Sequence, residues 1–194
     1  SKSLGNGVGP ADIIPHYGVE AFRYYFLRHV PTQDDGDFTW EKFEAAYNGE
    51  LGNDLGNLVQ RVAKMVQSYQ AGVIGDAPQA EHDMDPYRQA MESFMFDQAM
   101  DEIWRIIRTL NQYIERVQPW QVAKNRDKDP EAEAHLGEIL AHACGALLQV
   151  SDMLRPFMPQ TAEKIHEMFA SGVVPSELTP LFPRKYLHTA DPRA

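Results

Sequence analysis

A stripe of apolar residues at unbroken helical spacing is the feature that most constrains the fold of this chain. Its members recur every three or four residues over about six helical turns: Phe96, Met100, Ile103, Ile107, Leu110, Ile114 and Val117. This spacing places all of them on one face of a single α-helix. Pro119 then ends the helix, because proline cannot donate the hydrogen bond of a further turn. Such a helix must bury its apolar face against other elements.

The same periodicity recurs along the chain, so the elements that cover this face are predicted to be helices too. We expect a short helical turn over 11–16 and further helices over 19–29, from Thr39 for about thirty residues, over 131–154 and over 160–169. Polar connectors at 72–86 and 125–130 separate them, and strand signals are almost absent apart from one short strand expected around Leu181. The sequence therefore predicts a mainly α fold, an antiparallel helical bundle, with an irregular tail from Ser171. A bundle alone says nothing about function.

The long helix after Thr39 contains residues that disfavour helix. Gly49, Gly52 and Gly56 interrupt its first half, and each costs up to ~1 kcal/mol relative to alanine. We expect either a bend or a close contact with a neighbouring element there. Asp37 or Thr39 is placed to cap the start of this helix.

Composition excludes several classes of protein. The single cysteine, Cys144, rules out a disulfide framework or a CxxC site, and its apolar neighbours predict a small buried side chain. No stretch is long and apolar enough for a membrane span, and the N-terminus lacks a signal pattern. The histidines form no ligand set, since His135 and His142 could share a face but have no third ligand nearby. We expect a cytoplasmic protein without a metal site.

The net charge argues against non-specific binding of nucleic acid. The chain has a formal net charge of −10 and a pI near 5.1. Any RNA contact must therefore be a local patch of positive and aromatic residues that reads splayed single-stranded bases. We expect no DNA partner and no membrane partner.

The first residues carry a specific pattern. The opening Ser-Lys-Ser-Leu-Gly-Asn of residues 1–6 is followed by Pro10, Asp12, Tyr17-Gly18 and Arg23-Tyr24. This combination resembles the stretch that closes the catalytic domain of class I aminoacyl-tRNA synthetases, where the loop Lys-Met-Ser-Lys-Ser runs into a small stem-contact fold. Because the Lys-Met half is missing, we expect a fragment. The resemblance matches Lys2 to the lysine that offsets charge developing on ATP. Without a nucleotide-binding sheet, Lys2 could equally be a frayed terminal lysine.

Two later motifs resemble the anticodon-reading elements of methionyl-tRNA synthetases. They are Asn-Leu-Val-Gln-Arg at 57–61 and Pro-Trp-Gln-Val-Ala-Lys at 119–124, and Leu-Arg-Pro-Phe-Met-Pro at 154–159 is similar to a stretch that such bundles share widely. The resemblance runs from Ser1 to about Arg184. It implies a stem-contact segment over 1–46 and an anticodon-binding bundle over 47–194.

The chemistry of three residues fits that role. Asn57 and Arg61 are four residues apart, so they share a helix face beside the apolar stripe. An asparagine amide both donates and accepts, and an arginine offers a planar fork of donors, which suits an unpaired cytosine. Trp120 can stack on a splayed base, and such stacking contributes ~1–3 kcal/mol. Read without the motifs, Arg61 could pair with Asp54 on a solvated face, and Trp120 could be a core residue.

The resemblance implies that the partners are the anticodon loops of initiator and elongator methionine tRNA, with the triplet CAU, and the missing catalytic domain. Lys64, Lys124 and Arg126 are candidates for phosphate contacts. ATP with Mg²⁺ would be a substrate of the full enzyme, while this part needs no cofactor and is expected to be inactive alone. Two alternatives stay open. One is the bundle of a synthetase for cysteine, valine, isoleucine or leucine, and the other is a helical module that binds proteins through an exposed apolar stripe. The net charge of −10 fits the protein-binding module better than it fits RNA binding.

Overall fold

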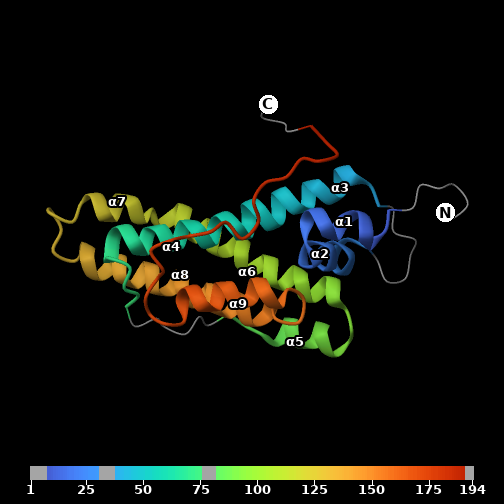
Figure 1. The fold of residues 1–194 in the computed structure, drawn as a ribbon. Helices are drawn as coiled ribbons and strands as arrows, with labels where there is room; N and C mark the ends of the chain where they lie inside the picture. Colours follow the sequence, from blue (N-terminus) through green and yellow to red (C-terminus); the bar gives the residue numbers. More distant parts are fainter. Residues whose placement is uncertain (1–7, 31–37, 76–81, 191–194) are drawn as a thin grey trace, which may run out of the picture.

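The computed structural model describes residues 8–30, 38–75 and 82–190, and helices dominate all three ranges (Figure 1). Their bounds are α1 (Pro10–Tyr17), α2 (Val19–His29), α3 (Trp40–Ala45), η2 (Ala46–Gly56), α4 (Asn57–Gln70), α5 (Asp85–Glu92), α6 (Phe96–Val117), α7 (Pro119–Lys124), α8 (Ala132–Leu154) and α9 (Pro159–Phe169). Within these ranges no strand forms, and β pairing is limited to an isolated bridge between Val73 and Val173. The predicted helical bundle is confirmed.

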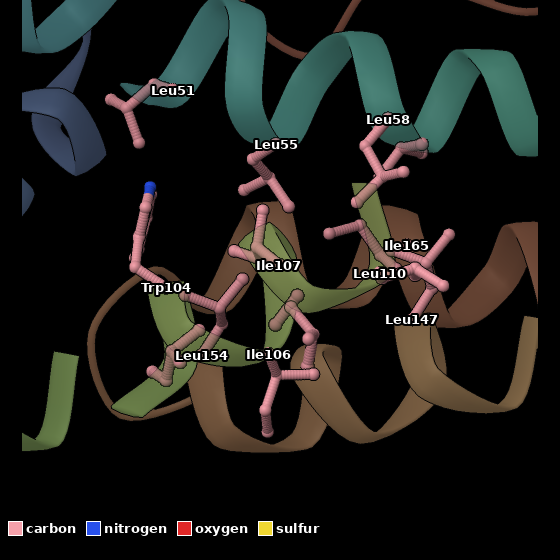
Figure 2. Packing of buried hydrophobic residues seen from close by; sticks show 14 of the residues in the cluster. Leu51, Leu55, Leu58, Trp104, Ile106, Ile107, Leu110, Leu147, Leu154 and Ile165 are labelled. Carbon is pink, nitrogen blue, oxygen red and sulfur yellow. The ribbon is translucent and has the colours of Figure 1, made fainter. Parts of the chain in front are cut away.

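The core lies where α6 is enclosed between η2 and α4 on one side and α8 and α9 on the other. Figure 2 shows side chains in register across the first of these boundaries: Leu51 lies opposite Trp104, Leu55 opposite Ile107 and Leu58 opposite Leu110. All six are 2% exposed or less. Sequence number rises in the same direction on both sides, so α4 and α6 run parallel. Helices α6, α8 and α9, in contrast, alternate in direction (Figure 1).

Most predictions about burial are confirmed. Trp104 and Cys144 are fully buried, and burial raises the pKa of the Cys144 thiol to about 12. Trp40 is an exception, because it opens α3 at the edge of the molecule and is only half-buried, with its ring stacked 3.5 Å from that of His188. The apolar stripes face the core, so the described helices offer no exposed stripe for a protein partner.

One continuous helix joins α3, η2 and α4. Thr39 caps it as predicted, its hydroxyl accepting a hydrogen bond from the Lys42 backbone at 3.2 Å. The middle part, η2, is π-helical, and the glycine contact expected there is present. A Cβ on Gly52 would lie 3.6 Å from the Phe182 carbonyl oxygen, and the backbone of Phe182 also approaches Gly56. The predicted boundary between residues 46 and 47 falls inside this continuous helix, and it stays a prediction.

Helix α2 is fixed to the turn between α8 and α9 by two charged side chains. The Glu20 carboxylate accepts hydrogen bonds from the backbone N–H groups of Gln160 and Thr161, at 2.6 and 3.0 Å, and so caps α9. The Arg23 guanidinium donates to the carbonyl oxygens of Pro156 and Phe157, at 2.8 and 2.9 Å. These bonds satisfy helix-end groups that otherwise have no partner, and they attach the N-terminal helices to the bundle.

The C-terminal tail crosses α4 and η2 and ends against α3 (Figure 1). The buried Glu44 carboxylate holds it by accepting backbone hydrogen bonds from Leu187, His188 and Thr189 at 2.9 to 3.0 Å. Burial alone would raise the pKa of Glu44. The hydrogen bonds from Thr189, from Tyr17 and from the tail backbone outweigh this effect and hold the pKa below its usual value. The irregular tail predicted from its prolines is therefore tied to the N-terminal helices.

Two helices of the structure were not predicted, and one predicted strand does not form. Helices α5 and α7 were not expected, and each is too short to show a clear apolar period. No strand forms around Leu181, which packs on the core as irregular chain. Among the described residues, no helix is long and apolar enough to cross a membrane, and no cluster of three metal-ligating side chains occurs.

Candidate RNA-binding groove

A groove of about 560 Å³ runs between α4 and α6. Its lining is mostly polar: Asn53, Asn57, Leu58, Gln60, Arg61, Lys64, Met65, Ser68, Tyr69 and Asn111. Residues 57, 61, 64 and 68 follow one another along a single face of α4 at intervals of three and four. The opposite face of α4 is the buried stripe, so packing the stripe into the core turns this polar face toward the groove. The structure thus brings Asn57, Arg61 and Lys64 together.

Arg61 is held by α6 across the groove. Its Nη1 forms an ion pair with Glu115 at 2.5 Å, and its Nη2 donates to the Asn111 Oδ1 at 3.0 Å. The Asn111 amide in turn donates to the backbone carbonyls of Asp54 and Ile107, both at 3.2 Å. The interpretation that paired Arg61 with Asp54 was wrong, because α6 offers the partners. Two of the five guanidinium N–H donors are used, which leaves three for a ligand.

Asn57 is exposed at the end of the groove nearest the tail. Its amide donates to Asn53 Oδ1 at 3.3 Å, and Arg184 donates to the same oxygen at 2.6 Å. Asn53 and Arg184 were not identified from sequence. Asn53 lies one turn before Asn57 on the same face, so helical spacing gave a signal for it. Arg184 comes from the tail, whose path has no sequence signal.

Trp120 lies on α7, just beyond the end of α6. Gln118 adopts a left-handed backbone, φ 47°, and turns the chain from α6 into α7. The indole is half-buried against the core and makes no hydrogen bond or ring stack with the other described residues. It does not line the groove, and it lies on the helix that follows the one carrying Asn111 and Glu115. Trp120 is therefore not a fully buried core residue like Trp104.

The predicted phosphate contacts divide into two kinds. Lys64 and Lys124 are exposed, and Lys64 lines the groove. Arg126 is engaged within the protein, where it donates to the Tyr69 carbonyl, pairs with Glu133 at 3.0 Å and lies over the Tyr69 ring at 5.8 Å. A phosphate would have to compete with these contacts. Lys2 lies outside the described residues.

Two protein-family models match this chain. Residues 1–63 match the model described as tRNA synthetases class I (M), and residues 81–190 match the model described as the anticodon-binding domain of tRNA ligase. The chain belongs to the anticodon-binding domain family of tRNA ligases. The second match includes Trp120 and the α6 wall of the groove, while the first ends within α4 and includes Asn57 and Arg61.

The relatives of this anticodon-binding domain are methionine ligases. It is 40% identical over 188 residues to the methionine–tRNA ligase of Streptomyces coelicolor, covering 91% of this chain and 34% of the relative. It is 37% identical over 179 residues to that of Bacillus subtilis, covering 86% of this chain and 26% of the relative. The chain thus spans about a third of these proteins or less, and corresponds to their C-terminal part.

Solved structures of a methionyl-tRNA synthetase contain a region with the same fold as this chain. The methionyl-tRNA synthetase of Mycobacterium tuberculosis in its apo form superposes with a TM-score of 0.83 at 25% identity, over 92% of this chain and 41% of that one. The same enzyme bound by methionyl-adenylate gives 0.85 at 26% identity, over 94% and 41% of the two chains.

Proposed function

We propose that this domain receives the anticodon loop of methionine tRNA in the groove between α4 and α6, and that Arg61 together with Glu115 reads the first anticodon base. The observation that carries the proposal is the ion pair itself. It places a carboxylate acceptor beside a guanidinium that retains three unused N–H donors.

This pair complements cytosine. Along its pairing edge, cytosine presents a donor, the N4 amino group, followed by two acceptors, N3 and O2. Arg61 can donate to the two acceptors, and the Glu115 carboxylate can accept from the amino group, as acidic side chains do with cytosine N4. Uracil presents acceptor, donor, acceptor, so it would set its O4 against the carboxylate. The groove therefore favours CAU over UAU as well as over GAU.

The neighbouring residues support a splayed loop. The Asn57 amide oxygen forms no hydrogen bond with another described residue and can accept one from a base or a ribose. Trp120 offers a half-buried ring beyond the α6 wall, where a base leaving the groove would stack. Lys64, which lines the groove, and the exposed Lys124 would contact the loop phosphates. These roles belong to initiator and elongator tRNA alike, because the two share the anticodon.

The remaining roles concern the whole enzyme. We propose that a catalytic domain, absent from this chain, forms methionyl-adenylate from methionine and ATP with Mg²⁺ and passes the methionyl group to the tRNA. Residues 1–46 would connect that domain to the bundle at 47–194. Lys2 would act on ATP only in that setting, so this chain alone is expected to carry out neither step.

The test is a low-salt fluorescence anisotropy titration of this chain with anticodon stem-loops that differ only in the first base, CAU, UAU and GAU. We expect the CAU loop to bind at least about 10-fold more tightly than either of the other loops, since each base-edge mismatch costs ~1–3 kcal/mol. Equal binding of the three loops, or no binding of any, would overturn the proposal. The electrostatic contribution common to all loops is measured by repeating the series at higher salt.

A further inference from the structure

A second pocket, of about 490 Å³, lies on the other side of α6. It is formed by residues of α6, by His142 of α8 and by His82, which precedes α5, with this lining: His82, Thr109, Leu110, Gln112, Tyr113, Arg116 and His142. Since successive residues of a helix are rotated by about 100°, residues 109, 113 and 116 project away from residues 111 and 115, which hold Arg61. The two cavities are therefore separated by the body of α6.

The rings and the cation of this pocket lie close together. The Tyr113 ring is 4.9 Å from that of His142, and the His142 ring is 6.4 Å from that of His82, measured between centroids. The Arg116 guanidinium lies 5.8 Å from the Tyr113 ring. No ion pair joins Arg116 to another described residue, and none of the described lining residues is a carboxylate. In a chain of net charge −10, this is a concave site made of a cation, two imidazoles and a phenol.

We propose that this pocket binds a nucleotide, with the phosphate at Arg116 and the two imidazoles and the base against Tyr113. The shared chemistry is a phosphate carried beside a planar base. It has two sources, a free mononucleotide or a nucleotide of an RNA chain.

Three physical arguments support this choice of ligand. An arginine guanidinium and imidazolium groups form charge-assisted hydrogen bonds with phosphate oxygens. An aromatic ring offers a base a stacking surface that tolerates any base. The volume also falls in the range of small-ligand sites, about 300–1,000 Å³. An apolar ligand would leave the Arg116 and imidazole donors without partners.

The charges around this pocket should make its binding of a phosphate depend on pH. Burial, followed by the charges of His142 and Arg105, holds the pKa of His82 below its ordinary value, so protonation of this site is unfavourable while it holds no anion. Among the described residues, the Glu138 carboxylate acts on Tyr113 from α8, and the Glu102 carboxylate is paired with Arg105 at 2.7 Å. A bound phosphate would relieve the repulsion that these charges exert on protonated His82, so phosphate binding and protonation of His82 should strengthen each other.

The experiment measures binding of AMP, inorganic phosphate and adenosine to this chain by isothermal titration calorimetry, at two pH values either side of the histidine range of about 6 to 7.5. We expect AMP to bind more tightly than phosphate or adenosine, and more tightly at the lower pH. Arg116→Gln should weaken AMP by about 10-fold and His142→Gln by a smaller factor. Arg88→Gln, which removes an exposed arginine of α5, is the matched control and should change nothing.

The CAU stem-loop distinguishes the two sources of nucleotide. If AMP fails to bind but Arg116→Gln weakens the stem-loop, while Arg88→Gln does not, the ligand is a nucleotide of the RNA. If neither AMP, phosphate nor the stem-loop responds to Arg116→Gln, the proposal is overturned. This result is independent of the base preference at Arg61, so the two proposals fail separately.

Discussion

Helix α6 separates two polar cavities that differ in how their arginines are partnered. In the groove on the α4 side, Arg61 is paired with Glu115 and Asn111. In the pocket on the α8 side, Arg116 lies over an aromatic ring and has no carboxylate partner among the described residues. An arginine side chain thus lies beside a carboxylate acceptor in one cavity and without such an acceptor in the other.

That difference determines what each cavity can discriminate. A donor beside an acceptor matches only a base edge that offers the reverse pattern, so a site of this kind reads sequence. Donors alone attract phosphate, which every nucleotide carries, so a site of that kind is blind to sequence. The carboxylate also cancels the net attraction for RNA, which is consistent with base recognition by an acidic protein.

Removing Arg61 should have the largest effect. Arg61→Ala is expected to weaken the CAU stem-loop by about 100-fold, because it removes the donors and leaves the Glu115 carboxylate facing the RNA phosphates without a counter-charge. Both side chains are partly exposed, so the melting temperature should change little. Anisotropy titration measures the affinity. Arg88→Ala removes the same charge from α5, and an equal loss in that variant would show that only overall charge matters.

The Trp120 ring tests stacking separately from base reading. Trp120→Ala should cost ~1–3 kcal/mol of binding free energy, and the loss should be similar for CAU and GAU because stacking tolerates any base. Trp120→Phe, which keeps an aromatic ring, should recover most of the affinity. A loss confined to CAU would mean that the indole takes part in base discrimination, and would shift that role away from Arg61.

The contrast between the two sides of α6 was only partly visible in the sequence. Apolar spacing predicted α6, α8 and the face of α4 that carries Asn57 and Arg61, because helical periodicity fixes which residues share a face. It could not predict Glu115 as the partner of Arg61, since that pair depends on the parallel packing of α4 and α6. The pocket of Arg116 depends on the connector, which contributes His82 and follows no period.

Contacts of the backbone were the least predictable. The bond network of Glu44 joins α3 to residues 187–189, and neither segment has a pattern that indicates the other. The π-helical η2 was also missed, because Leu51, Leu55 and Leu58 keep a spacing that an ordinary helix would show. The tail contacts both regions, through the bonds to Glu44 and through Phe182 at Gly52 and Gly56, and a tail without periodicity cannot be placed by spacing alone.

The role of Glu115 is tested most sharply by a ratio of affinities. Glu115→Gln should lower the preference for CAU over UAU by about 10-fold while changing the affinity for CAU much less, because an amide can rotate to accept from cytosine N4 or donate to uracil O4. Titrations with both loops give the ratio. Glu138→Gln, an exposed carboxylate of α8, is the control. A uniform loss with an unchanged ratio would mean that Glu115 only orients Arg61.

The smallest effect is expected at the other side of α6, in the stability of the chain. The pKa of His82 is lowered by burial and by neighbouring cations, so the unfolded chain binds a proton at this site more readily than the folded one. Stability should therefore fall as pH drops through the ordinary histidine pKa of about 6.5, and the melting temperature should fall with it. His82→Gln should remove this slope, and His135→Gln, an exposed histidine of α8, should not. Phosphate should reduce the slope in the wild-type chain, because a bound anion stabilises the protonated pocket. A slope that survives His82→Gln would place the titrating group elsewhere in the chain.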